Sequence, residues 1–152
     1  MIVFLDTSTL LAACWSTKGL SHVLIECGHK EGWRLTTADY CVAEVEKNAG
    51  KYPEGPSRWR RAIRPHLAVV GSIYVIDRPI VFEATKDRPV LLSAIGADAD
   101  YLVTSDKADF GHILGTVVYG VNVRTPKTFL LEMGLVEESS VIPRGPKSSG
   151  KN

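Results

Sequence analysis

The distribution of apolar and polar residues predicts strands that alternate with helices. Residues 2–5 form a continuous apolar run of strand-forming residues, which is typical of a strand covered on both faces. A polar turn follows, and the apolar run 10–13 then predicts the start of a helix. Further strands are predicted at 33–36, 72–77, 101–104 and, around Gly120, within 117–123.

Helix-start signals follow most of these strands. Helices are predicted to begin at Ser21, at Thr36 and Thr37, at Arg58 (with an interruption at Pro65), at Asp87 and at Thr125. The pair Thr125-Pro126 is a strong start, because Thr caps well and Pro is favoured in the first helical position. Strands alternating with helices predict an α/β fold with a mainly parallel sheet. We expect one domain over residues 1–136 and a flexible tail, rich in Ser, Gly, Pro and Lys, over 137–152.

Composition and charge exclude little. The 152 residues are 45% hydrophobic and 23% charged, which is typical of a folded globular protein. The formal net charge of +1 means that any contact with nucleic acid must come from local patches. The three cysteines have no Cys-x-x-Cys spacing and are interpreted as buried thiols.

No targeting or membrane segment is predicted. The N-terminal apolar run stops at Asp6, too early for a signal peptide. No apolar stretch approaches the ~20 residues of a membrane span. We therefore expect a cytoplasmic protein with no membrane partner.

Two carboxylates come directly after predicted strands. Asp6 follows the first strand and Asp106 follows the strand 101–104. In open α/β sheets, ligands bind outside the carboxyl ends of the strands. An acid that ends a buried apolar strand incurs a desolvation cost unless it is paired. Asp6 and Asp106 are therefore candidates for a functional site at the edge of the sheet where the carboxyl ends of the strands meet.

Three further acids are candidates for the same edge. Asp87 begins a predicted helix, Glu44 lies in the helix after the second strand, and Asp109 follows Asp106 by three residues. Taken alone, Asp87 fits a helix cap and Glu44 a solvated helix residue. Together, such carboxylates would repel one another unless a cation neutralised them, and oxygen ligands suit Mg²⁺ or Mn²⁺. Ser8 and Thr104 are either turn or cap residues or hydroxyls that hold these carboxylates in place.

Five segments resemble the PIN-domain family. The resemblance runs from Met1 to about Gly134, and the segment 101–106 is its most specific part, whereas the match at Glu44 is the loosest. The segments are Ile2–Ser8, Cys41–Val45, Lys86–Leu91, Ala97–Lys107 and Val123–Leu130. This chain departs from many relatives at Arg88-Pro89, but no acid is lost.

The resemblance implies a three-layer α/β/α sandwich and a Mg²⁺- or Mn²⁺-dependent ribonuclease. It implies that the products carry a 5′-phosphate and a 3′-hydroxyl, and that Ser8 supports Asp6. Many small members resemble VapC-type toxins, so an antitoxin partner and a homodimer are expected. The metal-binding and catalytic acids that it implies are Asp6, Glu44, Asp87 and Asp106, with Asp109 as an optional addition.

The densest basic cluster suggests a contact for RNA. It consists of Arg58, Arg60, Arg61 and Arg64. Phosphate binding is one interpretation, with Trp59 as a stacking surface. The other is a solvated amphipathic helix whose Trp59 and Ile63 pack inward. The sequence leaves both open.

Three functional hypotheses remain. The first is a metal-dependent endoribonuclease, the toxin of a toxin–antitoxin pair. The second is a catalytically silent PIN-like module that binds RNA or protein, against which the presence of all four acids argues. The third is an aspartyl-phosphate phosphotransfer enzyme, which would need a second acid where this chain has Ser8.

Overall fold

The computed structural model describes residues 1–71 and 88–138. Its centre is a six-stranded sheet with the strand order β3-β2-β1-β4-β6-β5. The strands are β1 (Ile2–Leu5), β2 (Arg34–Ala38), β3 (Ala68–Val70), β4 (Tyr101–Val103), β5 (Val117–Val118) and β6 (Val121–Arg124). Neighbouring strands run parallel from β3 to β6, and the edge strand β5 pairs antiparallel with β6. The prediction of a mainly parallel sheet is confirmed.

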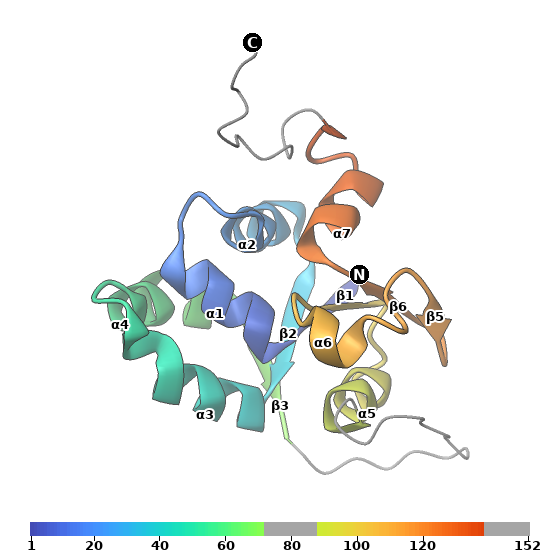
Figure 1. Ribbon diagram of the computed structural model, residues 1–152, viewed down its shortest axis with the longest axis horizontal. Helices are drawn as coiled ribbons and strands as arrows, with labels where there is room; N and C mark the ends of the chain where they lie inside the picture. Colours follow the sequence, from blue (N-terminus) through green and yellow to red (C-terminus); the bar gives the residue numbers. More distant parts are fainter. Residues whose placement is uncertain (72–87, 139–152) are drawn as a thin grey trace.

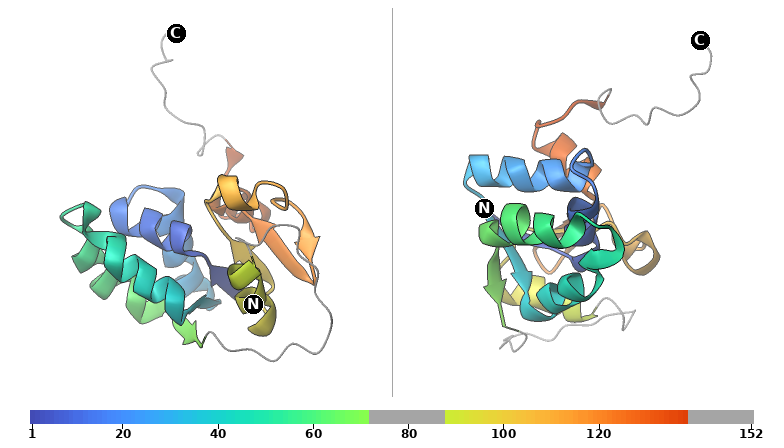
Figure 2. Two further views of the ribbon diagram at one scale, coloured as in Figure 1. Left: turned by 60° about the horizontal axis from the view of Figure 1, so that its bottom comes forward. Right: turned by 90° about the vertical axis from the view of Figure 1, so that its left-hand side faces the viewer.

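Helices cover both faces of this sheet. Helices α2 and α7 lie on one face and α5 lies on the other (Figure 1), while α1 packs beside α2, α3 and α4 (Figure 2). The helices are α1 (Thr7–Trp15), α2 (Leu20–Glu31), α3 (Asp39–Asn48), α4 (Gly55–Arg58), α5 (Arg88–Gly96), α6 (Lys107–Phe110) and α7 (Pro126–Glu132). This is the α/β/α sandwich that the resemblance implied. Within the described ranges, no helix is long and apolar enough to cross a membrane.

Two apolar clusters, one on each face, explain the sequence of β1. Val3 and Leu5 belong to the cluster beneath α1, α2 and α7, whereas Phe4 belongs to the cluster beneath α5. All three side chains are fully buried. Successive side chains of a strand point to opposite faces, so a strand covered on both sides is apolar throughout. The apolar run therefore ends where β1 leaves the core, at Asp6.

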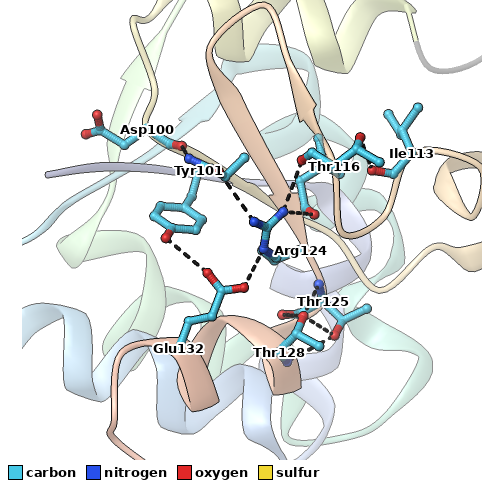
Figure 3. Close-up of polar contacts among 10 residues, drawn as sticks. Asp100, Tyr101, Ile113, Thr116, Arg124, Thr125, Thr128 and Glu132 are labelled. Atoms are coloured by element: carbon cyan, nitrogen blue, oxygen red, sulfur yellow. Dashed lines mark hydrogen bonds and ion pairs between the residues drawn. The ribbon is translucent and has the colours of Figure 1, made fainter.

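The polar contacts of Arg124 fasten α7 to the sheet (Figure 3). Arg124, on β6, forms an ion pair with Glu132 in the last turn of α7. The other carboxylate oxygen of Glu132 accepts a hydrogen bond from the Tyr101 hydroxyl on β4, at 3.2 Å. At the start of α7, Thr125 and Thr128 form a reciprocal capping box. Helix α7 is thus held at both ends.

Three helix predictions need correction. Thr36 and Thr37 belong to β2, and the helix expected to begin at them begins at Asp39. Helix α2 begins at Leu20 after the N-cap residue Gly19, so Ser21 is not its cap. The helix expected at Arg58 begins instead at Gly55 and continues to His66 with a π-helical turn and a final 3₁₀ turn. Pro65 has no backbone N–H to donate, which explains why regular α-helix does not continue there.

Other predictions fall partly beyond the described residues. The strand expected over 72–77, the cap residue Asp87 and most of the expected tail 137–152 lie outside those residues. The third strand that the structure shows is Ala68–Val70. The short helix α6 was not predicted.

Candidate metal and active site

Asp6 lies at the junction of β1 and α1. Its backbone amide donates to the carbonyl oxygen of Val103 at 3.1 Å, which extends the ladder between β1 and β4. Its carboxylate caps α1 by accepting a hydrogen bond from the Thr7 amide at 2.8 Å. The residue is only 6% exposed. The end of an apolar strand thus carries a carboxylate into a nearly dry position at the carboxyl edge of the sheet.

Two hydroxyls connect Asp6 to the segment after β4. Thr104 Oγ1 donates to Asp6 Oδ2 at 2.8 Å, and Ser8 Oγ donates to the same oxygen at 3.0 Å. Each hydroxyl also accepts a backbone amide, Thr104 from Asp106 at 3.1 Å and Ser8 from Ser105 at 3.0 Å. This geometry fits the supporting role predicted for Ser8 and Thr104, which stays a prediction.

Burial controls the ionisation of Asp6. It raises the pKa of this carboxyl above the ordinary value of 3.8, and the negative charge of Asp106 raises it further. Hydrogen bonds from Thr104, Ser8 and the Thr7 amide oppose this rise. A nearby cation would stabilise the charged form.

An open pocket of about 430 Å³ gathers the predicted acids of the described ranges. Glu44, on α3, accepts a hydrogen bond from the Thr7 hydroxyl at 3.2 Å, and Asp106 caps α6 by accepting the Asp109 amide at 3.0 Å. Of the side chains placed by the structure, no lysine, arginine or histidine lines this pocket. The lining residues are Asp6, Thr7, Ser8, Leu11, Tyr40, Glu44, Pro89, Val90, Asp106, Asp109 and Phe110.

The donors of this pocket fit a hydrated Mg²⁺ or Mn²⁺ ion. Within residues 1–71 and 88–138, no three His, Cys, Asp or Glu side chains converge closely enough to hold a metal ion by themselves. Mg²⁺, however, keeps several of its waters and binds to proteins through one or two carboxylates. A carboxylate set without nitrogen or sulfur donors suits such hard ions. Asp87 lies outside the described residues, although Pro89 and Val90, which follow it closely, line the pocket.

Two polar residues of the pocket were not singled out by the sequence. Thr7 bonds to Glu44, and Tyr40 lies four residues before Glu44 on the same helix. That spacing puts Tyr40 and Glu44 on one helix face, so the pattern could have identified Tyr40. The Tyr40 hydroxyl lies 3.2 Å from Ser93 Oγ and links α3 to α5.

The predicted arginine cluster lies apart from this pocket. Trp59 is 3% exposed and Ile63 is fully buried, so both pack inward and Trp59 cannot serve as the suggested stacking surface. Arg58 donates to the carbonyl oxygen of Cys14, near the far end of α1. None of Arg58, Arg60, Arg61 and Arg64 lines the acidic pocket. RNA binding by these arginines stays a prediction.

Replacing Thr104 with valine is expected to weaken Mn²⁺ binding by about 10- to 100-fold, the usual effect of losing a partner that orients a metal ligand. Valine keeps the shape of threonine but removes both the bond to Asp6 and the acceptor of the Asp106 amide. Titration calorimetry measures the affinity, and Thr104→Ser, which keeps the hydroxyl, is the matched control. Equal Mn²⁺ affinity in the valine variant and the wild type would contradict the supporting role.

Comparisons with known proteins identify the family and support the fold. The sequence matches the profile of the PIN domain over residues 2–108. The structure of VapBC2 from Rickettsia felis, bound to a DNA fragment from their promoter, contains a chain of similar fold, with a TM-score of 0.57 and 14% sequence identity. That alignment covers 82% of this chain and 98% of the other, and at this identity it establishes the fold alone. No curated protein sequence matches the chain.

Proposed function

The chain belongs to the PIN domain family, and from this premise we propose that it is an endoribonuclease that hydrolyses RNA phosphodiester bonds with Mg²⁺ or Mn²⁺. One observation supports the proposal above all. Four carboxylates, those of Asp6, Glu44, Asp106 and Asp109, line one pocket without a basic side chain from the described residues. Negative charge gathered in this way favours a divalent cation and, with the cation bound, a phosphate.

Each residue has a distinct part in the proposed reaction. A bound ion would polarise the phosphodiester and lower the pKa of a water molecule. Asp6 holds its carboxylate in one orientation through the hydroxyls of Ser8 and Thr104. Asp106 is fixed beside it through its amide. Glu44, Asp87 and Asp109 complete the proposed ligand set, and no side-chain nucleophile is needed.

We propose further that the protein is the toxin of a toxin–antitoxin pair, acts in the cytoplasm and forms a homodimer. The likeness to a chain of the VapBC2 complex supports this setting through the shared fold. Co-expression with the product of the neighbouring gene, followed by co-purification, tests the partner. Relief by that product of a growth defect caused by the chain would support a toxin, and absence of any growth defect would contradict it.

Cleavage of a mixed structured RNA pool tests the enzymatic proposal. We expect cutting with Mn²⁺ or Mg²⁺, none with a chelator, and products that carry a 5′-phosphate. The Asp106→Asn variant, purified in parallel, should cut at least about 100-fold more slowly. It loses a proposed direct metal ligand, and the loss of a residue that only orients such a ligand already lowers activity by up to about 100-fold. Equal cutting by both proteins would indicate a contaminating nuclease. No cutting by folded wild-type protein with either metal would contradict the proposal.

The competing function is a PIN-like module that binds RNA or protein without cutting it. One observation favours it: in the described part of the chain no three potential ligands form a preassembled metal site. Calorimetry with Mn²⁺ separates the two. A folded protein that binds RNA but neither binds Mn²⁺ nor cuts RNA would be the silent module.

A further inference from the structure

A second pocket, of about 380 Å³, lies on the other side of the turn that joins β4 to α6. Asp106 lines the acidic pocket, whereas its neighbours Ser105 and Lys107 line this one. The remaining lining comes from the last turns of α1, the first residues of α2 and the first residues of α7. We call it the lysine pocket.

The charge of the lysine pocket is opposite to that of its neighbour. Lys107 and Lys127 line it, and none of its lining residues is acidic. Lys107 is exposed and has no ion-pair partner among the residues that the structure describes. Lys127 lies 3.5 Å from Glu138, but both side chains are largely exposed, and an exposed pair of this kind is weak. Both lysines are therefore available to an anion.

The start of α2 adds hydrogen-bond donors to this pocket. This helix has 12 residues, and its N-cap residue, Gly19, has no side chain that could bond to the amides of the first turn. Gly19, Leu20 and Ser21 line the pocket. Free amides and the helix dipole favour an anion at such a position.

The buried Ser21 hydroxyl is a second, independent observation that points to a ligand in this pocket. Ser21 is 6% exposed, yet within the described ranges no side-chain hydrogen bond to it is found. Buried hydroxyls are normally bonded, and leaving one unpaired costs stability. A phosphate oxygen in the pocket would accept this hydroxyl, together with the lysine ammonium groups.

We propose that the lysine pocket binds a backbone phosphate of the RNA substrate, next to the phosphate that is cut. The inference rests on the proposed function and identifies how the strand is held. Ala12, Leu20 and Pro126 provide an apolar surface for the adjoining ribose or base.

The coupling of the two pockets favours a nucleic-acid strand over a free anion. Ser8 accepts the Ser105 amide and Thr104 accepts the Asp106 amide, so the turn between the pockets is fixed to the residues around Asp6. One strand can thus place a phosphate at the metal and a neighbouring phosphate between the lysines. Two-point attachment of this kind fixes the position of the strand relative to the metal.

Binding measured in a protein that cannot cut tests the proposal. In the full-length Asp6→Asn protein, without metal, fluorescence anisotropy follows a random pool of labelled single-stranded RNA decamers. Lys107→Gln and Lys127→Gln should each weaken binding about tenfold and lower the slope of log affinity against log salt by about 0.7, the value for one lost phosphate contact. Ser21→Ala should weaken binding about threefold with an unchanged slope, because it removes a hydrogen bond and no charge.

Lys30→Gln is the matched control. Lys30 lies in the last turn of α2, the helix that begins at the pocket, and does not line the pocket itself. Its replacement by Gln removes one positive charge, as the two pocket substitutions do. We expect it to change binding less than twofold, and urea unfolding shows whether every variant is folded. If the pocket variants bind RNA as Lys30→Gln does, the proposal is wrong.

Two further comparisons separate this inference from its alternatives. Displacement of labelled RNA by inorganic phosphate as effectively as by unlabelled RNA would overturn a strand-binding site. If Lys107→Gln and Lys127→Gln bind a labelled acidic peptide more weakly than the unsubstituted pocket does, but bind RNA equally well, the pocket would belong to a protein partner instead. If the wild type cuts RNA and the pocket variants bind RNA normally, the proposal for the lysine pocket is wrong but the nuclease proposal stands. If the pocket variants bind RNA more weakly but the wild type does not cut RNA, the proposal for the lysine pocket is supported and the nuclease proposal is not.

Discussion

The Asp6→Asn variant is expected to lose RNA cleavage and, without metal, to gain stability at neutral pH. Cleavage should fall by about 100-fold or more, since even residues that only orient metal ligands contribute up to that factor. Stability should rise because Asp6 is 6% exposed and its charge is disfavoured by burial and by Asp106. Asparagine carries no charge and caps helices as well as aspartate does. On this expectation, the residue that weakens the metal-free fold is also the one on which the proposed activity depends.

The effect of pH on this difference has a definite sign. Because the pKa of Asp6 is raised in the folded protein, the unfolded chain releases this proton first as the pH rises past 3.8. The free energy of unfolding of the metal-free wild type therefore falls relative to that of Asp6→Asn through the acidic range. The gap should be smallest below pH 3.8 and should widen as the pH rises from there towards neutral. Mn²⁺ should reverse it, because the ion stabilises the wild-type carboxylate.

Urea unfolding at several pH values, with Mn²⁺ and with chelator, measures both parts of this expectation. Glu54→Gln serves as control, because Glu54 is exposed and lies outside the acidic pocket. This substitution removes one negative charge, as Asp6→Asn does. A metal-free Asp6→Asn protein that is less stable than wild type at neutral pH would show that the hydrogen bonds to Asp6 outweigh its desolvation. Undiminished cleavage would remove Asp6 from the site.

Residues whose position is set by the local sequence could be predicted. The apolar run of β1 requires two covered faces, and the next residue, Asp6, must then emerge at the carboxyl edge. The same reasoning locates Asp106 after β4, because β1 and β4 are parallel neighbours. The start of α7 is encoded by Thr125 and Pro126. In these places the local pattern and the three-dimensional fold agree.

Features that depend on contacts between distant segments could not be predicted. A run of four residues is too short to show helical periodicity, so α6 carried no signal beyond the capping aspartate. Ser21 resembles a helix cap, yet it is buried in the first turn of α2, because the helix begins one residue earlier at Leu20. The lysine pocket joins Lys107 to Lys127 across 20 residues of sequence, and only the packing of α7 brings them together.

The largest loss of stability is expected from Phe129→Ala, at about 3–5 kcal/mol of unfolding free energy. Phe129 is fully buried on α7 and packs edge-on against two rings, Trp33 at 5.2 Å and Tyr101 at 4.8 Å between centroids. Alanine leaves a cavity and removes both aromatic contacts, each of which adds about 0.5–1.5 kcal/mol beyond its buried area. A domain of this size has a total stability of only about 5–15 kcal/mol, so a large part of it depends on this one side chain.

The ion pair at the end of the same helix offers the matched comparison. Glu132→Gln removes the ion pair between Glu132 and Arg124. Because the Glu132 side chain is 39% exposed, this change should lower the free energy of unfolding by less than about 1 kcal/mol. Urea unfolding at neutral pH measures both variants. A loss below 1 kcal/mol for Phe129→Ala would mean that the polar contacts of Arg124, and not the aromatic cluster, hold α7 on the sheet. Since α7 carries Lys127 into the lysine pocket, the folded Phe129→Ala protein should also bind RNA more weakly than Glu132→Gln, which leaves the packing of α7 intact.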